Sequence, residues 1–131
     1  MKIKANEFRI GNLIDTPYGI LPIYGISKNC IEVEYNSEDV SIYDFNLDEC
    51  KPIPITEEWL LKFGFIANGI SYKLENNNYL IELYFYDCWN LNYIEKEKFG
   101  NGNVKLKGYW NIHQLQNLYF ALTGNELEMF D

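Results

Sequence analysis

Residues 51–65 contain the clearest boundary and helix signals of the chain: Lys51-Pro52-Ile53-Pro54-Ile55-Thr56-Glu57-Glu58-Trp59-Leu60-Leu61-Lys62-Phe63-Gly64-Phe65. Pro52 and Pro54 each remove a backbone donor and hold the chain extended, so its first part can be neither a helix nor a central strand. Ile53 and Ile55 alternate with the prolines, which predicts a strap packed on a core rather than a free linker. This strap is the expected boundary between two parts, a small β module over residues 1–51 and a helix–meander–helix part over residues 52–131. The two parts are expected to pack as one compact unit or as two tightly apposed subdomains.

A short helix is predicted directly after the strap. Thr56 is a good N-cap, and Glu57 and Glu58 place carboxylates in the first turn, where the helix dipole favours anions. Gly64 is suited to the left-handed conformation that ends many helices. The pattern therefore predicts a helix from Glu57 to Phe63, with Gly64 at positive φ.

Residues 8–45 carry short apolar alternations separated by turn residues such as Pro17-Tyr18-Gly19. Four strands are expected, Arg9–Asp15, Ile20–Ile26, Cys30–Tyr35 and Val40–Phe45, with a turn at residues 36–39 between the last two. Glu32 and Glu34 fall on one face of the third strand, opposite Ile31 and Val33. Four close-spaced strands with tight turns are typical of a small SH3-like β-barrel or a curled meander.

The rest of the chain predicts a four-stranded antiparallel sheet followed by a C-terminal helix. The strands are expected near residues 70–75, 81–86, 91–96 and 104–110, with a turn at residues 76–78 and a turn cluster at residues 99–103. One face of such a sheet is normally buried. Asn111 and Gln114 have the spacing of a capping box for a helix over residues 112–122, which Gly124 ends. The predicted fold class is therefore α+β.

Composition narrows the class of protein. The 131 residues carry a net charge of −8, and 17% of them are aromatic. An acidic field repels phosphate backbones, so it disfavours nucleic acid and anionic membranes as partners. No apolar stretch follows the start Met1–Asn6, so no signal peptide is expected. Cys30, Cys50 and Cys88 are odd in number and widely spaced, which is typical of reduced thiols in a cytoplasmic protein.

The spacing of the cysteines and the histidine favours neither a metal site nor a nucleophilic catalytic site. The nearest two thiols, Cys30 and Cys50, are 20 residues apart, whereas structural zinc sites take ligands in close pairs. His113 is the single histidine, and no nucleophile motif accompanies it. We expect it to be a surface or capping histidine at the start of the last helix. No cofactor and no metal are predicted, and the paired acids are expected to form solvated strand faces.

The aromatic pattern is more informative. If Ile81, Leu83 and Phe85 face the core, then Tyr84 and Tyr86 point to the other face of the sheet. The candidate binding residues on this side are Tyr84, Tyr86, Tyr109, Lys105 and Lys107. Tyrosine supplies large contact area in protein interfaces, and aromatic rings beside lysines also suit base stacking. An ordinary solvated sheet face is the alternative without a binding role.

Three motifs carry a resemblance to a known group. They are Arg9-Ile10-Gly11-Asn12-Leu13-Ile14, the run from Pro54 to Phe65, and the run His113-Gln114-Leu115-Gln116-Asn117-Leu118-Tyr119-Phe120-Ala121-Leu122-Thr123-Gly124-Asn125-Glu126-Leu127. With them the chain resembles a group of small uncharacterised proteins of bacterial prophages and mobile elements. The resemblance implies a cytoplasmic accessory protein that acts on a host or phage partner, and it brings no activity, cofactor or catalytic residue with it.

Taken together, these patterns favour a non-enzymatic interaction protein that binds a protein partner through an aromatic-rich surface. The alternative is a module that binds nucleic acid or a small ligand on the Tyr/Lys sheet face. An enzyme ranks third.

Overall fold

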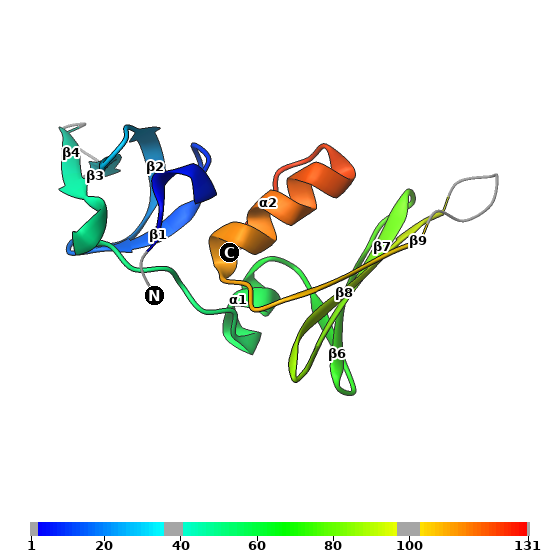
Figure 1. Ribbon diagram of the computed structural model, residues 1–131. Helices are drawn as coiled ribbons and strands as arrows, with labels where there is room; N and C mark the ends of the chain where they lie inside the picture. Colours follow the sequence, from blue (N-terminus) through cyan, green and yellow to red (C-terminus); the bar gives the residue numbers. More distant parts are fainter. Residues whose placement is uncertain (1–2, 36–40, 97–102, 131) are drawn as a thin grey trace. The chain divides into compact units, whose positions relative to one another are not determined.

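The computed structural model describes residues 3–35, 41–96 and 103–130, and its chain forms two compact units (Figure 1). The first unit comprises residues 1–54 and 111–126, and the second comprises residues 55–110 and 127–131. The chain therefore leaves the first unit after the strap and returns to it for its last helix. This grouping by contacts differs from the division at residue 51 expected from the sequence, which placed the last helix with the second sheet.

The first unit combines a four-stranded antiparallel sheet with that helix. Its elements are the 3-10 helix η1 (Ala5–Glu7), the strands β1 (Leu13–Thr16), β2 (Gly19–Ile26), β3 (Cys30–Tyr35) and β4 (Ser41–Asn46), the 3-10 helix η2 (Leu47–Glu49) and the helix α2 (Ile112–Thr123). The sheet order is β1-β2-β3-β4, so the strands follow one another as a meander. All four expected strands are present.

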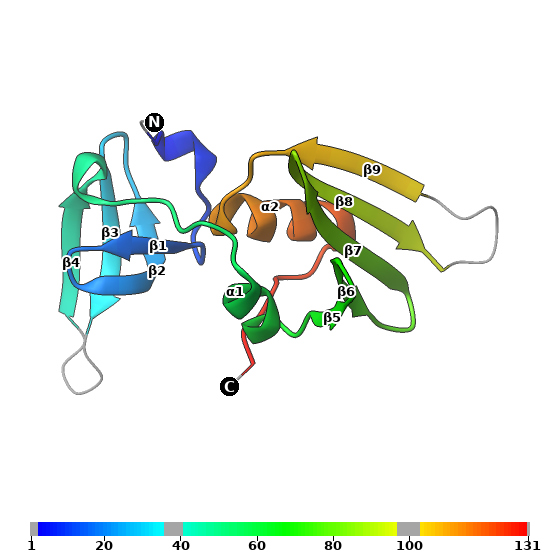
Figure 2. The ribbon, with the colours of Figure 1, turned by 90° about the horizontal axis from the view of Figure 1, so that it is seen from below.

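The sheet is not closed into a barrel, so that part of the expectation is wrong and the meander is confirmed. Residues 19–22 of β2 pair with β1, and its later residues pair with β3 (Figure 2). The free edge of β1 is satisfied by other groups: the Asp15 amide donates to the Lys51 carbonyl at 3.1 Å, and the Leu13 amide donates to Gln116 Oε1 at 2.9 Å. Because the strap and α2 take these donors, β1 has no need of β4 as a partner.

A bulge in β2 allows residues on both sides of it to pack against the core. Ile23 pairs with Val33, but Gly25 pairs with Glu32, so the register shifts between them. The extra residue allows Ile23 and Ile26, three positions apart, to face the same side. The buried core of this sheet consists of Phe8, Ile14, Ile23, Ile31, Val33, Phe45, Leu47 and Cys50.

The second unit contains a five-stranded antiparallel sheet and one short helix. Its elements are α1 (Glu57–Lys62), β5 (Ile66–Asn68), β6 (Ser71–Glu75), β7 (Tyr79–Tyr86), β8 (Cys88–Glu95) and β9 (Asn103–Gly108), in the sheet order β5-β6-β7-β8-β9. The prediction of four strands missed β5, which is three residues long with every side chain exposed, so it has no apolar alternation to read. The turn expected at residues 36–39 and residues 99–102 of the other turn cluster lie outside the described residues.

Helix α1 begins and ends as its sequence predicts. Thr56 Oγ1 accepts a hydrogen bond from the Trp59 amide at 3.3 Å, and Gly64 has φ +91°. The Phe65 amide donates to the Leu60 carbonyl and the Gly64 amide donates to the Leu61 carbonyl, both at 3.0 Å. This pair of bonds is the Schellman motif, which satisfies the last carbonyls of a helix.

Helix α2 also follows its predicted caps. The Gln114 side chain accepts from the Asn111 amide at 2.8 Å, which is the reciprocal bond of a capping box, and Gly124 ends the helix at φ +77°. In the part of the chain that the structure describes, no helix combines the length and apolar character needed to cross a membrane.

Candidate functional site

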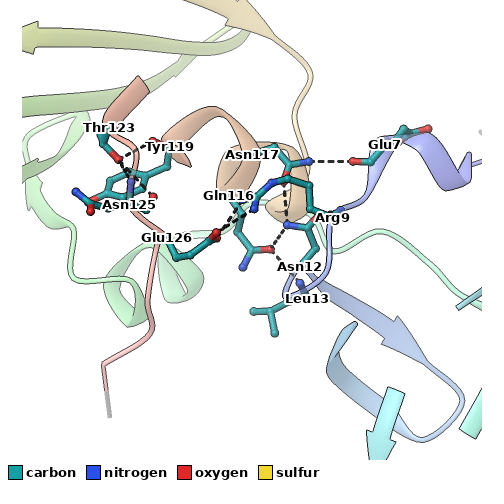
Figure 3. Close-up of polar contacts among 10 residues, drawn as sticks. All are labelled: Glu7, Arg9, Asn12, Leu13, Gln116, Asn117, Tyr119, Thr123, Asn125 and Glu126. Carbon is teal, nitrogen blue, oxygen red and sulfur yellow. Dashed lines mark hydrogen bonds and ion pairs between the residues drawn. The ribbon is translucent and has the colours of Figure 1, made fainter. Parts of the chain in front are cut away.

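A polar network joins the start of the chain to α2 within the first unit (Figure 3). Asn117 lies at its centre. Its Oδ1 accepts from Arg9 Nε at 3.0 Å and from Asn12 Nδ2 at 2.9 Å, while its Nδ2 donates to the Glu7 carbonyl at 2.9 Å. One amide side chain therefore uses both of its polar atoms to hold three residues that are more than 100 positions away in the sequence.

The network extends to both sides of Asn117. Arg9 forms a two-bond pair with the Glu126 carboxylate, at 2.9 and 3.0 Å, and its guanidinium lies 4.4 Å from the centre of the Phe120 ring. Gln116 accepts from the Leu13 amide at the edge of β1. The contacts connect the first and third motifs of the predicted resemblance. Their residue types are thus explained by how α2 is held against the first sheet, without any catalytic role.

His113 is not a surface histidine, so that expectation is wrong. Its side chain is completely buried, its ring stacks on Phe8 with centroids 4.1 Å apart, and its Nε2 lies 3.1 Å from Glu7 Oε1. Burial lowers the pKa of His113 below its usual value, although the bond to Glu7 opposes this shift. The neutral imidazole is enclosed and serves the packing of α2, since no open surface reaches it.

The thiols do not assemble a reactive centre among the described residues. Burial, together with Glu49 and Asp15, raises the pKa of the Cys50 thiol to about 11, which disfavours the thiolate needed for nucleophilic attack. No group of three or more potential metal ligands occurs within residues 3–35, 41–96 and 103–130. A hollow of about 530 Å³ in the first unit is lined by neither cysteine nor histidine; its walls are Ile3, Lys4, Ala5, Lys28, Asn29, Asn46, Leu47 and Asp48.

The strand register places the predicted binding residues of the second unit. Tyr84 pairs with Asn90, which in turn pairs with Lys107, so these three side chains form one row across the sheet. Lys105 lies in the next row on the same face, opposite Asn92. Tyr84 is only partly exposed, whereas Lys105 and Lys107 on the edge strand β9 are exposed. Lysines on an edge strand also discourage pairing with another sheet.

This Tyr/Lys face is not uniformly basic. Glu82 lies between Lys73 and Asn92 in the row of Lys105, and it accepts a hydrogen bond from Asn92 at 3.3 Å. A carboxylate in the middle of the face repels a phosphate backbone. The arrangement therefore weakens the nucleic-acid alternative that the lysines alone suggested.

The other predicted tyrosines lie at one end of this sheet. Tyr86 is the last residue of β7 and is 79% exposed, and Tyr109 follows the end of β9 and is 75% exposed. Phe85 pairs with Trp89, which pairs with Gly108, so the register brings the ends of β7 and β9 to the start of β8. We call the four aromatic residues Phe85, Tyr86, Trp89 and Tyr109 the aromatic end.

Two members of the aromatic end, Phe85 and Trp89, are not among the binding residues predicted from the sequence. Phe85 was assigned to the core because it shares a face with Ile81 and Leu83, yet it is 58% exposed. Its ring packs edge to face on the ring of Trp89, with the two ring centroids 5.4 Å apart. The available signal was Asp87, which occupies a one-residue turn at φ +66° between β7 and β8. Side chains beside a tight turn lie at the rim of a sheet, where a core covers them less.

Comparison of the chain with family models, with curated proteins and with solved structures finds no match.

Proposed function

We propose that this chain is a non-enzymatic interaction protein of prophage or mobile-element origin, which binds a protein partner in the cytoplasm through the aromatic end. The observation that carries the proposal is the gathering of aromatic side chains at one end of the five-stranded sheet, where Phe85, Tyr86 and Tyr109 are exposed and Trp89 is partly exposed. By strand parity, Phe85 and Trp89 lie on one face of this end and Tyr86 on the other. Exposed contiguous apolar patches on a protein surface mark interaction sites, and Tyr and Trp are enriched among the residues that dominate binding energy.

The two ends of the sheet differ in character. At the aromatic end the β5–β6 turn adds Ile70, which is 85% exposed and directly precedes Ser71, the partner of Tyr84. At the opposite end the β6–β7 turn consists of Asn76, Asn77 and Asn78, and Glu75 forms an ion pair with Lys96. Ile66 and Val104 are exposed away from this end, so it is the exposed aromatic side chains of the sheet, rather than all of its apolar ones, that gather at one end.

The rigid support of these side chains favours binding. Phe85 and Trp89 lie on paired strands, and their rings already contact each other before any partner arrives. Tyr and Trp lose few rotamers on binding, so pre-positioned rings give large contact area at a small entropic cost. The enclosed His113 and the raised pKa of Cys50 add no support for an enzyme.

The test is affinity capture with quantified variants. The wild-type chain is immobilised, partners from a lysate of the encoding organism are identified by mass spectrometry, and their affinity is measured with purified proteins. Tyr86→Ala combined with Tyr109→Ala should weaken binding by about thirtyfold or more, because hot-spot aromatics contribute about 1–2 kcal/mol or more each. The melting temperature should stay within a few degrees of wild type, since neither ring is buried.

Phe130→Ala is the matched control, because Phe130 is an exposed aromatic of the same unit outside the aromatic end. It should leave the affinity unchanged. A partner that binds the double variant as tightly as wild type contradicts the proposed site. Salt-sensitive binding of a single-stranded oligonucleotide that is lost on Lys105→Gln with Lys107→Gln supports the alternative function instead.

A further inference from the structure

A second exposed surface lies on the first sheet, on the face opposite its core. Ile14, Leu21, Ile23, Ile31, Val33 and Phe45 face the core, so the alternating residues of β2, β3 and β4 face outward. We call this surface the outer face of the first sheet; its residues are Ile20, Pro22, Tyr24, Glu32, Glu34, Ile42 and Asp44. It belongs to the other unit from the aromatic end, and the inference does not depend on that site.

The outer face of the first sheet is unusually apolar for a solvated sheet surface. Ile20, Tyr24 and Ile42 are each between two-fifths and one-half exposed, and Pro22 is exposed between the first two. Single exposed apolar side chains are ordinary, but several on one sheet face form a patch. Such a patch is suited to burial by another polypeptide.

The charges on this face all have one sign. Glu32 and Asp44 are direct cross-strand partners, and Glu34 is the partner of Ile42. The Glu32 carboxylate lies over Gly25, where an added Cβ would come within 2.8 Å of its Oε2. None of Glu32, Glu34 and Asp44 forms an ion pair or side-chain hydrogen bond with a residue that the structure describes, and strands β2, β3 and β4 contain no lysine or arginine.

Like charges directly opposite each other on neighbouring strands destabilise a sheet. A face that keeps Glu32 opposite Asp44, next to exposed apolar side chains, is therefore arranged for a ligand rather than for the stability of the isolated chain. We propose that the outer face of the first sheet binds a polypeptide segment that is both basic and apolar, with its cations placed against Glu32, Glu34 and Asp44 and its apolar side chains on Ile20, Tyr24 and Ile42. A second copy of this chain is a poor occupant, because it would present the same acids.

The probe is a labelled peptide of about eight residues, a length that covers a typical strand. Lysine and valine alternate at every second position with serine between them, so an extended strand presents both to the same face. Fluorescence anisotropy should show saturable binding that weakens as NaCl rises from about 0.05 M to about 0.5 M. Amide NMR shifts should map to β2, β3 and β4. The same peptide with glutamate in place of lysine should not bind, and the peptide with serine in place of valine should bind at least several-fold more weakly, because each removes one of the two features.

Asp44→Lys separates this inference from simple unfolding, because its two effects have opposite signs. It should weaken binding of the lysine–valine peptide by about tenfold, yet raise the melting temperature of the protein, because Glu32 then faces a cation. Glu95→Lys makes the same charge change on β8 in the second unit and should alter peptide affinity less than twofold.

Four results would overturn the inference, three of them in the peptide experiments. They are the absence of saturable binding, an equal loss of affinity in Asp44→Lys and Glu95→Lys, and NMR shifts that map outside the first sheet. A dimer in gel filtration that dissociates on Ile42→Ala would likewise overturn it, by showing that a second copy covers the face.

Discussion

Replacement of Gly64 by alanine should destabilise the second unit by two separable amounts. The first is conformational: φ is +91° at Gly64, and an alanine in this left-handed region costs about 1 kcal/mol relative to glycine. The second is steric. An added Cβ would lie 2.6 Å from Cε2 and 2.9 Å from Cδ2 of Phe130, so that ring has to leave its rotamer, at a further cost of about 0.5–1 kcal/mol.

The sum of about 1.5–2 kcal/mol should lower the melting temperature of the second unit by about 6–8 °C, taking about 4 °C per kcal/mol for a chain of this size. Gly69→Ala is the matched control, because Gly69 lies in the same unit at φ +66° with no atom within 4 Å of an added Cβ. It should lose only the conformational part, or about 4 °C.

Calorimetry of the wild type, Gly64→Ala, Gly69→Ala and the double variant Gly64→Ala with Phe130→Ala measures both parts. Removal of the Phe130 ring should relieve the steric part, so that the further loss caused by Gly64→Ala in the Phe130→Ala background is close to that of Gly69→Ala. An unchanged melting temperature in Gly64→Ala would refute the C-cap assignment. Equal losses at Gly64 in the presence and absence of Phe130 would refute the steric part alone.

Three further predictions concern Asn117, His113 and the thiols. Asn117→Ala removes three hydrogen bonds and should lower the free energy of unfolding by about 2–3 kcal/mol in chemical denaturation. Gln114→Ala removes one hydrogen bond and should lower it by about 1 kcal/mol. Equal losses would argue against the polar network as the support of α2. The pKa of His113 in the folded protein lies below its unfolded value of 6.5, so below that pH the unfolded state binds more protons and the free energy of unfolding should fall as pH falls. His113→Gln should flatten the plot of unfolding free energy against pH between about pH 5 and pH 7. An unaltered slope would contradict the buried neutral imidazole. Thiol titration in denaturant should count three free thiols. In the native protein at pH 8, Cys50, with its pKa of about 11, should react far more slowly than the partly exposed Cys30 and Cys88. A Cys50 that reacts equally fast would show that it is not enclosed.

Local features of the fold could be predicted from the sequence because the residues that cause them are neighbours. Thr56, Gly64 and Asn111 act on backbone groups a few positions away, and both helices begin and end where these residues require. The strands of both sheets followed from alternation with a period of two, except β5, whose three exposed residues give no such signal.

Long-range contacts could not be predicted in the same way. The burial of His113 depends on Phe8 and Glu7, and the open edge of β1 depends on Gln116, all more than 100 positions apart in the sequence. The one local hint was the polar pair Gln116-Asn117 directly after Leu115 in the apolar stripe of the helix, since buried amides need partners. For the aromatic end, the parity of β7 gave the correct face for Phe85 but not its exposure, because alternation does not report where a core ends.

The most direct test of the proposed function is a hydrogen–deuterium exchange footprint of the captured protein partner on this chain. Protection should concentrate on residues 84–90 and 108–110, the segments that carry the aromatic end, and should disappear when Tyr86→Ala and Tyr109→Ala are combined. A footprint that leaves these segments unprotected while the partner is bound would contradict the proposed binding site.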